Sequence, residues 1–458
     1  MRITAPFTWL ATALALAAVA LWPTFVKGRE AAARAASFPT PAPLVADYRE
    51  RDRTIAFWEG MVRKNLSDDM LSPRQLALQY LQRYRERGDL DDVLRAQRMA
   101  ERSLREQPRG NEGALIALAS VDLTLHRFKA ALAETKRLER LDPGEQMRVR
   151  EASLDLELGD YAGARRIIER LPPRKNFDIA RDTLVSRYDE LTGRLADARD
   201  LLERATADEN AVLETPAQQR AWFYFRSGEM AFEAGDNDAA VALEDRALAV
   251  FPNYAEANRL KAKFLCALHR WQGCLDAAIA SAAVVPYPET LGYEVDALRA
   301  LGRADEAART DDLIRVEERI GNAQHVSDRL LAIYYAEHRE RTAAAYAIAE
   351  RELAVRDDVF TEDTLAWAAA MDGRWREARA AERKALRYGT ENALFDYHAG
   401  VIAARFGDNA EAERDFERAL ALNASFHPFY ADDARTRLAR MKSSAGNARA
   451  QASDTKPS

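Results

Sequence analysis

The apolar positions of residues 392–423 fall at helical spacing in two short segments, which are separated by polar residues around Gly407. Apolar residues three or four positions apart share one face of a helix, so this pattern predicts two amphipathic helices joined by a tight turn. The same pattern occurs 34 residues earlier, where Gly373 takes the place of Gly407 and Ala378 takes the place of Ala412. A fixed period of this length indicates an array of helical repeats.

The most regular position in the repeat is a small residue early in the second helix of each unit. A small side chain lets two helix axes approach closely, while larger neighbours interdigitate around it. Glycine occupies the preceding turn in most units, because it adopts the left-handed conformation that ends a helix without steric cost. Ten units in register predict an all-α fold, an α-solenoid in which each helix pair buries its apolar face on its neighbours. The small residues are Ala96, Ala131, Ala164, Ala198, Ala240, Cys274, Ala307, Ala345, Ala378 and Ala412.

With these positions the chain resembles the tetratricopeptide repeat family, a stack of helix-turn-helix pairs, over residues 73–425. The unit that matches best ends at Pro252 and carries Gly228, Gly235, Ala240 and Ala247. The eighth unit departs from the pattern where a glycine and a small residue are expected, at Glu340 and Glu352. The resemblance implies a right-handed superhelix with a concave groove for peptides or protein segments, and it specifies no partner.

The segment before the array, residues 1–26, is expected to be a signal peptide or a membrane anchor. Its apolar run, residues 7–26, has no polar face and follows Arg2. A cleaved signal needs a shorter apolar segment and a small-residue cleavage site, whereas an anchor needs about 20 apolar residues, and the run satisfies both. Lys27 and Arg29 follow the run and oppose transfer of the downstream chain, so cleavage stays open.

The remaining segments follow from changes in composition. Residues 27–46 contain a proline-rich stretch and are expected to form an extended linker. The other boundaries place a capping helix within residues 47–72, the array at 73–425, a second capping helix at 426–442 and a disordered polar tail at 443–458. Within the array, residues 206–219 interrupt the period with polar residues and are expected to form a mobile loop.

The charge balance argues against nucleic-acid binding. The 67 Lys and Arg residues are scattered among 73 Asp and Glu residues, which gives a formal net charge of -6 and a pI of about 5.8. Phosphate binding needs a basic face, and the sequence shows none. The scattered charges are typical of solvated helix faces.

Candidate chemistry is sparse. The sequence holds no metal-binding HExxH motif, no histidine pair at metal-ligand spacing, and no phosphate- or dinucleotide-binding glycine motif. His126 and His269 take the turn position that glycine occupies elsewhere, which favours a structural role. After the segments above are assigned, no block of residues remains for a catalytic domain. We therefore expect no metal, no cofactor and no enzymatic activity.

The chain has two cysteines, Cys266 and Cys274. Cys274 occupies the small packing position, where a buried thiol acts as a small hydrophobe. The two residues fall on the two helices of one unit, so they have the opportunity to pair in an oxidising compartment. The sequence does not give the separation that a disulfide requires, and the pairing stays open.

The resemblance implies that the first helix of each pair lines the groove. Aromatic side chains exposed in a groove are common anchors for peptides, although each of them has the alternative of packing against adjacent helices. Counting back from each turn gives the candidate partner-binding residues Trp222, Phe225, Glu229, Phe232, Arg259, Lys263, Tyr334, Trp367 and Tyr397.

Together these expectations describe a scaffold that is exported or tethered to the membrane and binds peptide or protein segments in the periplasm or at the cell envelope. Two alternatives stay open: a membrane-anchored assembly factor that faces the cytoplasm, and a structural protein that associates with itself. The sequence leaves the partner, the pathway and the oligomeric state undetermined.

Overall fold

The computed structural model describes residues 47–173, 177–323 and 329–454, and these residues form helices and connecting turns without any β-strand. The predicted signal or anchor and linker, residues 1–46, lie outside this part of the chain. The elements are α2 (Asp47–Arg63), α3 (Leu71–Arg87), α4 (Leu90–Glu106), α5 (Glu112–Thr124), α6 (Phe128–Leu141), α7 (Glu145–Leu158), α8 (Tyr161–Ile168), α9 (Ile179–Leu191), α10 (Leu195–Ala211), α11 (Ala217–Glu233), α12 (Asn237–Val250), α13 (Ala255–Ala267), α14 (Trp271–Ala282), α15 (Pro288–Ala300), α16 (Ala304–Ala323), α17 (Arg329–Glu337), α18 (Thr342–Val355), α19 (Val359–Met371), α20 (Trp375–Ala385), the 3₁₀ helix η1 (Leu386–Tyr388), α21 (Ala393–Arg405), α22 (Asn409–Leu422) and α23 (Tyr430–Asp454).

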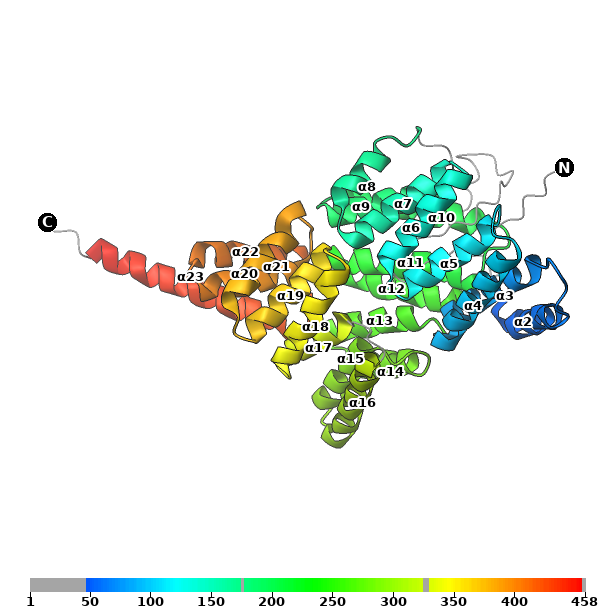
Figure 1. Ribbon diagram of the computed structural model, residues 1–458. Coiled ribbons are helices and arrows are strands. Elements are labelled where there is room, and N and C mark those ends of the chain that lie inside the picture. The colour runs from blue at the N-terminus through cyan, green and yellow to red at the C-terminus, as the bar shows by residue number, and fades with distance from the viewer. Residues whose placement is uncertain (1–46, 174–176, 324–328, 455–458) are drawn as a thin grey trace.

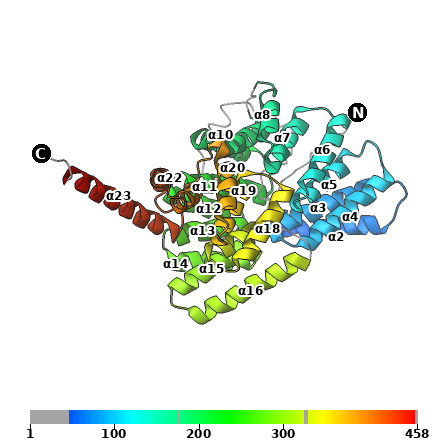
Figure 2. The same cartoon turned by 60° about the vertical axis from the view of Figure 1, so that its left-hand side comes forward.

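Ten consecutive helix pairs, from α3 and α4 to α21 and α22, form the body of the molecule (Figure 1). The two helices of each pair pack on one another, and neighbouring pairs pack side by side. Helix α2 covers the first pair, and α23 packs on α22 before it projects away from the body, as Figures 1 and 2 both show. This architecture is consistent with the predicted α-solenoid.

The small residues of the repeat lie where the two helices of a pair meet. All ten are at most 2% exposed, from Ala96 in α4 to Ala412 in α22. A larger side chain at such a position would push two helix axes apart, since the surrounding core is already filled. The periodic small residues are therefore packing positions, as the sequence predicts.

The turns adopt the left-handed conformation at the expected places. Gly159, Gly193 and Gly235 all have positive φ angles, and His126 and His269, which replace glycine in two units, each have a φ of 56°. The eighth unit differs, because positive φ angles occur there at two arginines, Arg339 and Arg341, on either side of the position where glycine was expected.

The array coils back on itself, so that the turn of one unit lies against the end of the unit five places later. A Cβ atom added at Gly159 would lie 2.0 Å from the carbonyl oxygen of Asp357, and one at Gly193 would lie 2.2 Å from that of Gly389. Gly235 is similarly close to Leu422. We call this line of contacts between the earlier and later units the seam.

Hydrogen bonds reinforce the seam. The Thr390 hydroxyl donates to the Leu191 carbonyl at 2.7 Å, and the Asn423 side-chain amide donates to the Phe232 carbonyl at 2.7 Å. The backbone N–H of Val359 likewise donates to the hydroxyl of Tyr161 at 3.0 Å. The concave face predicted as a groove is thereby enclosed between two coils of the array.

Two segments differ from the sequence-based expectations. Residues 206–219, predicted as a mobile loop, belong mostly to α10 and α11, and only residues 212–216 connect the two helices. The reason is burial, since Glu209 and Gln218 lie in the interior although they are polar. At the other end, α23 continues to Asp454, through most of the segment predicted to be disordered.

Cys266 and Cys274 form a disulfide between α13 and α14, with their Cα atoms 5.2 Å apart. Both residues are fully buried, so the bond lies inside one helix pair. Among the described residues, no helix combines the length and the apolar character needed to span a membrane.

Candidate binding cavity

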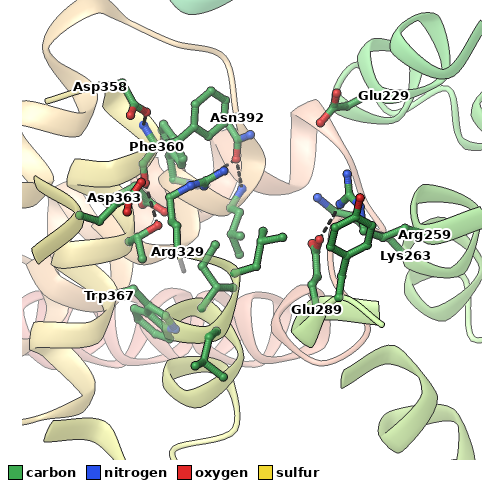
Figure 3. A pocket seen from close by; sticks show the side chains of 18 of the residues that line it. Glu229, Arg259, Lys263, Glu289, Arg329, Asp358, Phe360, Asp363, Trp367 and Asn392 are labelled. Carbon is green, nitrogen blue, oxygen red and sulfur yellow. Dashed lines mark hydrogen bonds and ion pairs between the residues drawn. The ribbon is translucent and has the colours of Figure 1, made fainter. Parts of the chain in front are cut away.

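A cavity of about 550 Å³ lies inside the coil, between the first helices of the middle units and those of the last units. Figure 3 shows its two walls. One wall carries Glu229, Arg259, Lys263 and Glu289, from α11, α13 and α15, and faces the other wall, formed by α17, α19 and α21. Because the seam joins these distant helices, residues far apart in the sequence line the same cavity.

Six of the nine candidate partner-binding residues line this cavity. They are Phe225, Glu229, Phe232, Arg259, Lys263 and Trp367. They come from α11, α13 and α19, the first helices of units five, six and nine. Counting back from each turn therefore placed these six on the inner face of the coil.

Trp222, Tyr334 and Tyr397 do not line the cavity. Trp222 is 1% exposed and packs edge-to-face on Phe223 within the core. The hydroxyl of Tyr334 donates to Asp311, and that of Tyr397 donates to Asp433, both at 2.7 Å. Packing between adjacent helices, the alternative considered for each of these positions, accounts for all three.

The wall made by α11, α13 and α15 is charged and tightly paired. Arg259 contacts Glu289 at 2.5 Å, and the Tyr293 hydroxyl donates to the same carboxylate at 2.6 Å. Burial works to raise the pKa of Glu289, but the charges of Arg259 and Lys263 outweigh it and hold that pKa below its ordinary value. The Lys263 ammonium lies 6.0 Å from the ring centroid of Phe232.

A second charged group connects α9 to the same wall. Arg187 and Arg226 contact one oxygen of Glu190 at 2.8 Å and 2.7 Å, and Arg226 also binds Glu229. Burial works to raise the pKa of Glu190, but the two arginines outweigh it and lower that pKa. The charges are thus fixed by their partners instead of rotating freely in the cavity.

The opposite wall combines aromatic rings with polar groups. The Phe360 ring lies 5.3 Å from the guanidinium of Arg187 and 5.7 Å from that of Arg329. His398 Nδ1 lies 2.9 Å from a carboxylate oxygen of Asp363, and its ring stacks on Trp367 with the centroids 4.1 Å apart.

Arg356 holds the cavity closed at the seam. Its guanidinium is 2.8 Å from Glu352, 3.4 Å from Asp358 and 3.6 Å from Glu157, which belongs to the earlier coil. It also lies 5.4 Å from the centroid of the Phe128 ring. All four charged groups are almost fully buried, so this cluster joins the two coils through a medium in which charges interact strongly.

Several cavity residues were missed from the sequence, among them Arg329, Phe360, Asn392 and His398. All four lie in or beside the first helices of units eight to ten. The spacing of the repeat marks these helices as inward-facing, but it does not show that the seam brings their amino-terminal ends opposite α11. For His398 the signal was a lone histidine in a first helix, which is weak on its own.

No group of three or more His, Cys, Asp or Glu side chains in the described part of the chain is arranged to hold a metal ion. The cavity instead offers cations, carboxylates, an imidazole and aromatic rings, which suit non-covalent binding of a polar ligand. No protein-family model matches this sequence, and no curated protein sequence matches it. The resemblance to tetratricopeptide repeats therefore rests on the repeat positions alone.

Proposed function

We propose that this protein is a scaffold, exported or tethered to the membrane, that binds peptide or protein segments inside its coil and is not an enzyme. The observation that carries the proposal is the cavity of about 550 Å³, which six independently selected groove positions line. Its walls combine aromatic rings with charged groups, the mixture that recognises a peptide backbone together with its side chains.

The disulfide supports the location of the scaffold outside the cytoplasm. Disulfides persist in oxidising compartments and are rare in the cytosol, so the pair Cys266 and Cys274 favours the exported location over the alternative of an assembly factor that faces the cytoplasm. The apolar run at residues 7–26 is consistent with export or with a membrane tether.

Site-specific photo-crosslinking in cells tests the proposal. A photoreactive amino acid at Lys263, on the cavity wall, is expected to capture a peptide or one defined segment of a partner protein, which mass spectrometry of the crosslinked product identifies. The control carries the same group at Arg246, which is exposed on α12. If position 263 captures nothing, or the same proteins as position 246, the cavity does not bind segments.

A further inference from the structure

Arg329 brings to the cavity a positive charge without an ion pair among the described residues. It is half-buried, and it forms no hydrogen bond or ion pair with any residue that the structure describes. The cations nearby differ, because Arg187 is bound to Glu190 and Arg356 is bound to three carboxylates. A cation that has lost much of its water without gaining a counter-ion costs free energy, and a bound anion recovers that cost.

The facing wall carries an excess of carboxylates. Glu229 and Glu233 are one helical turn apart on α11 and both line the cavity. Glu229 shares Arg226 with a second carboxylate. Glu233 has no ion pair within the described ranges, and its carboxylate accepts a hydrogen bond from the Asn392 amide at 3.5 Å. This wall is therefore short of positive charge, even with the ammonium of Lys263 beside it.

The pKa shifts agree with this polarity. Burial lowers the pKa of Arg329 and the neighbouring Arg356 lowers it further, while the carboxylates of Asp358, Glu352 and Glu289 offset only part of that shift. Burial raises the pKa of Glu233 well above its ordinary value, and the carboxylates of Glu190 and Glu229 add to that rise. The field inside the cavity thus runs from Arg329 toward α11.

The third feature of the cavity is the imidazole of His398, one nitrogen of which has no hydrogen-bond partner among the described residues. His398 lines the cavity and is 2% exposed. Its Nδ1 is bound to Asp363, whereas its Nε2 has no hydrogen-bond partner in the part of the chain that the structure describes. A buried polar atom without a partner is uncommon in folded proteins, and a hydrogen bond to a ligand in the cavity satisfies this one.

We propose that the cavity binds a short peptide with free ends, whose carboxylate pairs with Arg329 and whose ammonium group lies at Glu229 and Glu233. This inference rests on the proposed function and specifies its ligand as zwitterionic. The peptide backbone passes His398 Nε2, and apolar side chains of the ligand lie against Phe360 and Trp367. Figure 3 shows Phe360 and Trp367 on the same wall of the cavity as Arg329.

The volume and the charge balance favour a short zwitterionic peptide over a dianionic phosphate. Pockets that enclose a small ligand measure about 300–1,000 Å³, so a cavity of about 550 Å³ holds a short peptide with both ends inside. A dianionic phosphate is disfavoured, because ten carboxylate-bearing residues line the cavity against seven Lys and Arg residues. A single carboxylate at one end and an ammonium at the other match this distribution.

Calorimetric titration of the full-length protein with the tripeptide Ala-Phe-Ala tests the ligand class. Four forms of the probe are compared: free, acetylated at the amino end, amidated at the carboxyl end, and blocked at both ends. A hydrogen-bonded charge contributes about 1.5–3 kcal/mol, so blocking either end is expected to weaken binding about tenfold or more.

Two substitutions assign the ends of the peptide. Arg329→Gln is expected to weaken binding of the free tripeptide about tenfold and to leave binding of the amidated form unchanged. Glu229→Gln is expected to weaken binding of the free tripeptide about tenfold and to leave binding of the acetylated form unchanged. The matched control is Arg351→Gln, which removes an exposed cation from the cavity rim. Because Arg329 has no ion pair to lose among the residues that the structure describes, Arg329→Gln is expected to leave the unfolding temperature unchanged or higher.

The outcomes separate this inference from the function on which it rests. If the blocked and free tripeptides bind equally, or if Arg351→Gln weakens binding as much as Arg329→Gln, the zwitterionic ligand is wrong. If no tripeptide binds while position 263 still crosslinks a segment of a partner protein, the cavity takes internal segments and only the present inference fails. If neither experiment gives a signal, both proposals fail.

Discussion

At the scale of single residues, several buried charges in this protein are stabilised by a partner of opposite charge. His338 is an example: its Nε2 lies 2.9 Å from Asp296 and its Nδ1 lies 2.8 Å from the Tyr334 carbonyl. Burial by itself lowers the pKa of His338, but the hydrogen bond and charge of Asp296 outweigh it and raise that pKa to about 9. The imidazolium therefore links α15 to the end of α17.

This pair predicts a loss of stability at alkaline pH. A pKa raised in the folded state contributes stability that is fully present below about 6.5 and is lost as the pH rises through about 9. We expect Asp296→Asn to remove up to about 3 kcal/mol of unfolding free energy at pH 6 and much less at pH 9.5. Urea unfolding at both pH values measures this difference. Glu203→Gln, at an exposed position, is the control, and equal losses at both pH values would contradict the prediction.

At the scale of the elements, glycine has two distinct roles in the turns. Every turn glycine supplies a positive φ angle, but Gly159, Gly193 and Gly235 also leave room for the backbone of a later unit. A Cβ atom added at Gly373 or Gly407 meets no atom within 4 Å. The earlier glycines are thus required by the seam, and the later ones only by their own turns.

The difference predicts unequal effects of the same substitution. Gly373→Ala is expected to cost about 1–2 kcal/mol, the penalty of a left-handed conformation for a residue with a Cβ atom. Gly193→Ala incurs the same penalty and must also displace the Gly389 carbonyl. We therefore expect it to lower the unfolding free energy by at least about 2 kcal/mol more than Gly373→Ala does. Chemical unfolding of the two variants measures both losses. Similar losses would show that the contact at Gly193 relaxes without cost.

At the scale of the whole molecule, the seam turns an array of nearest-neighbour contacts into a closed body. In a simple solenoid each unit contacts only the adjacent units, so stability accumulates along the stack. Here Arg356 and its carboxylates, together with the hydrogen bonds of Val359, Thr390 and Asn423, couple units five places apart. We infer that opening of the cavity requires these contacts to separate together.

Arg356→Gln tests this coupling. The substitution leaves Glu157, Glu352 and Asp358 buried without their cation, which is expected to cost about 3–5 kcal/mol. Hydrogen exchange of the Val359 amide, which is bonded to Tyr161 across the seam, is expected to accelerate.

The control for this experiment is Arg374→Gln. Arg374 pairs with Asp372 and Glu377 on the surface, where solvent screens such pairs and they contribute little to stability. Slow exchange at Val359 in Arg356→Gln, or fast exchange at Val359 in Arg374→Gln, would show that the Arg356 cluster does not hold the seam.

Part of the candidate site was predictable from the sequence, and the remainder depended on the coil. Phe225, Glu229 and Phe232 fall on one face of α11 because helical spacing places them there. The same spacing also placed Trp222 on the inner face, but Trp222 packs on Phe223 in the core and does not line the cavity. Arg329 entered the site through contacts between units that no local pattern records.

The sequence by itself indicated a series of about ten helix pairs and the positions of most of their turns, because the period of small residues and glycine turns is local information. Only the tertiary structure decided that the concave face is enclosed, that residues 206–219 are largely helical, and that Cys266 pairs with Cys274. These features depend on contacts between segments distant along the chain, or on a separation of side chains in space. A repeat fixes how each unit packs on the next, whereas small rotations that accumulate over five units decide where the seam closes.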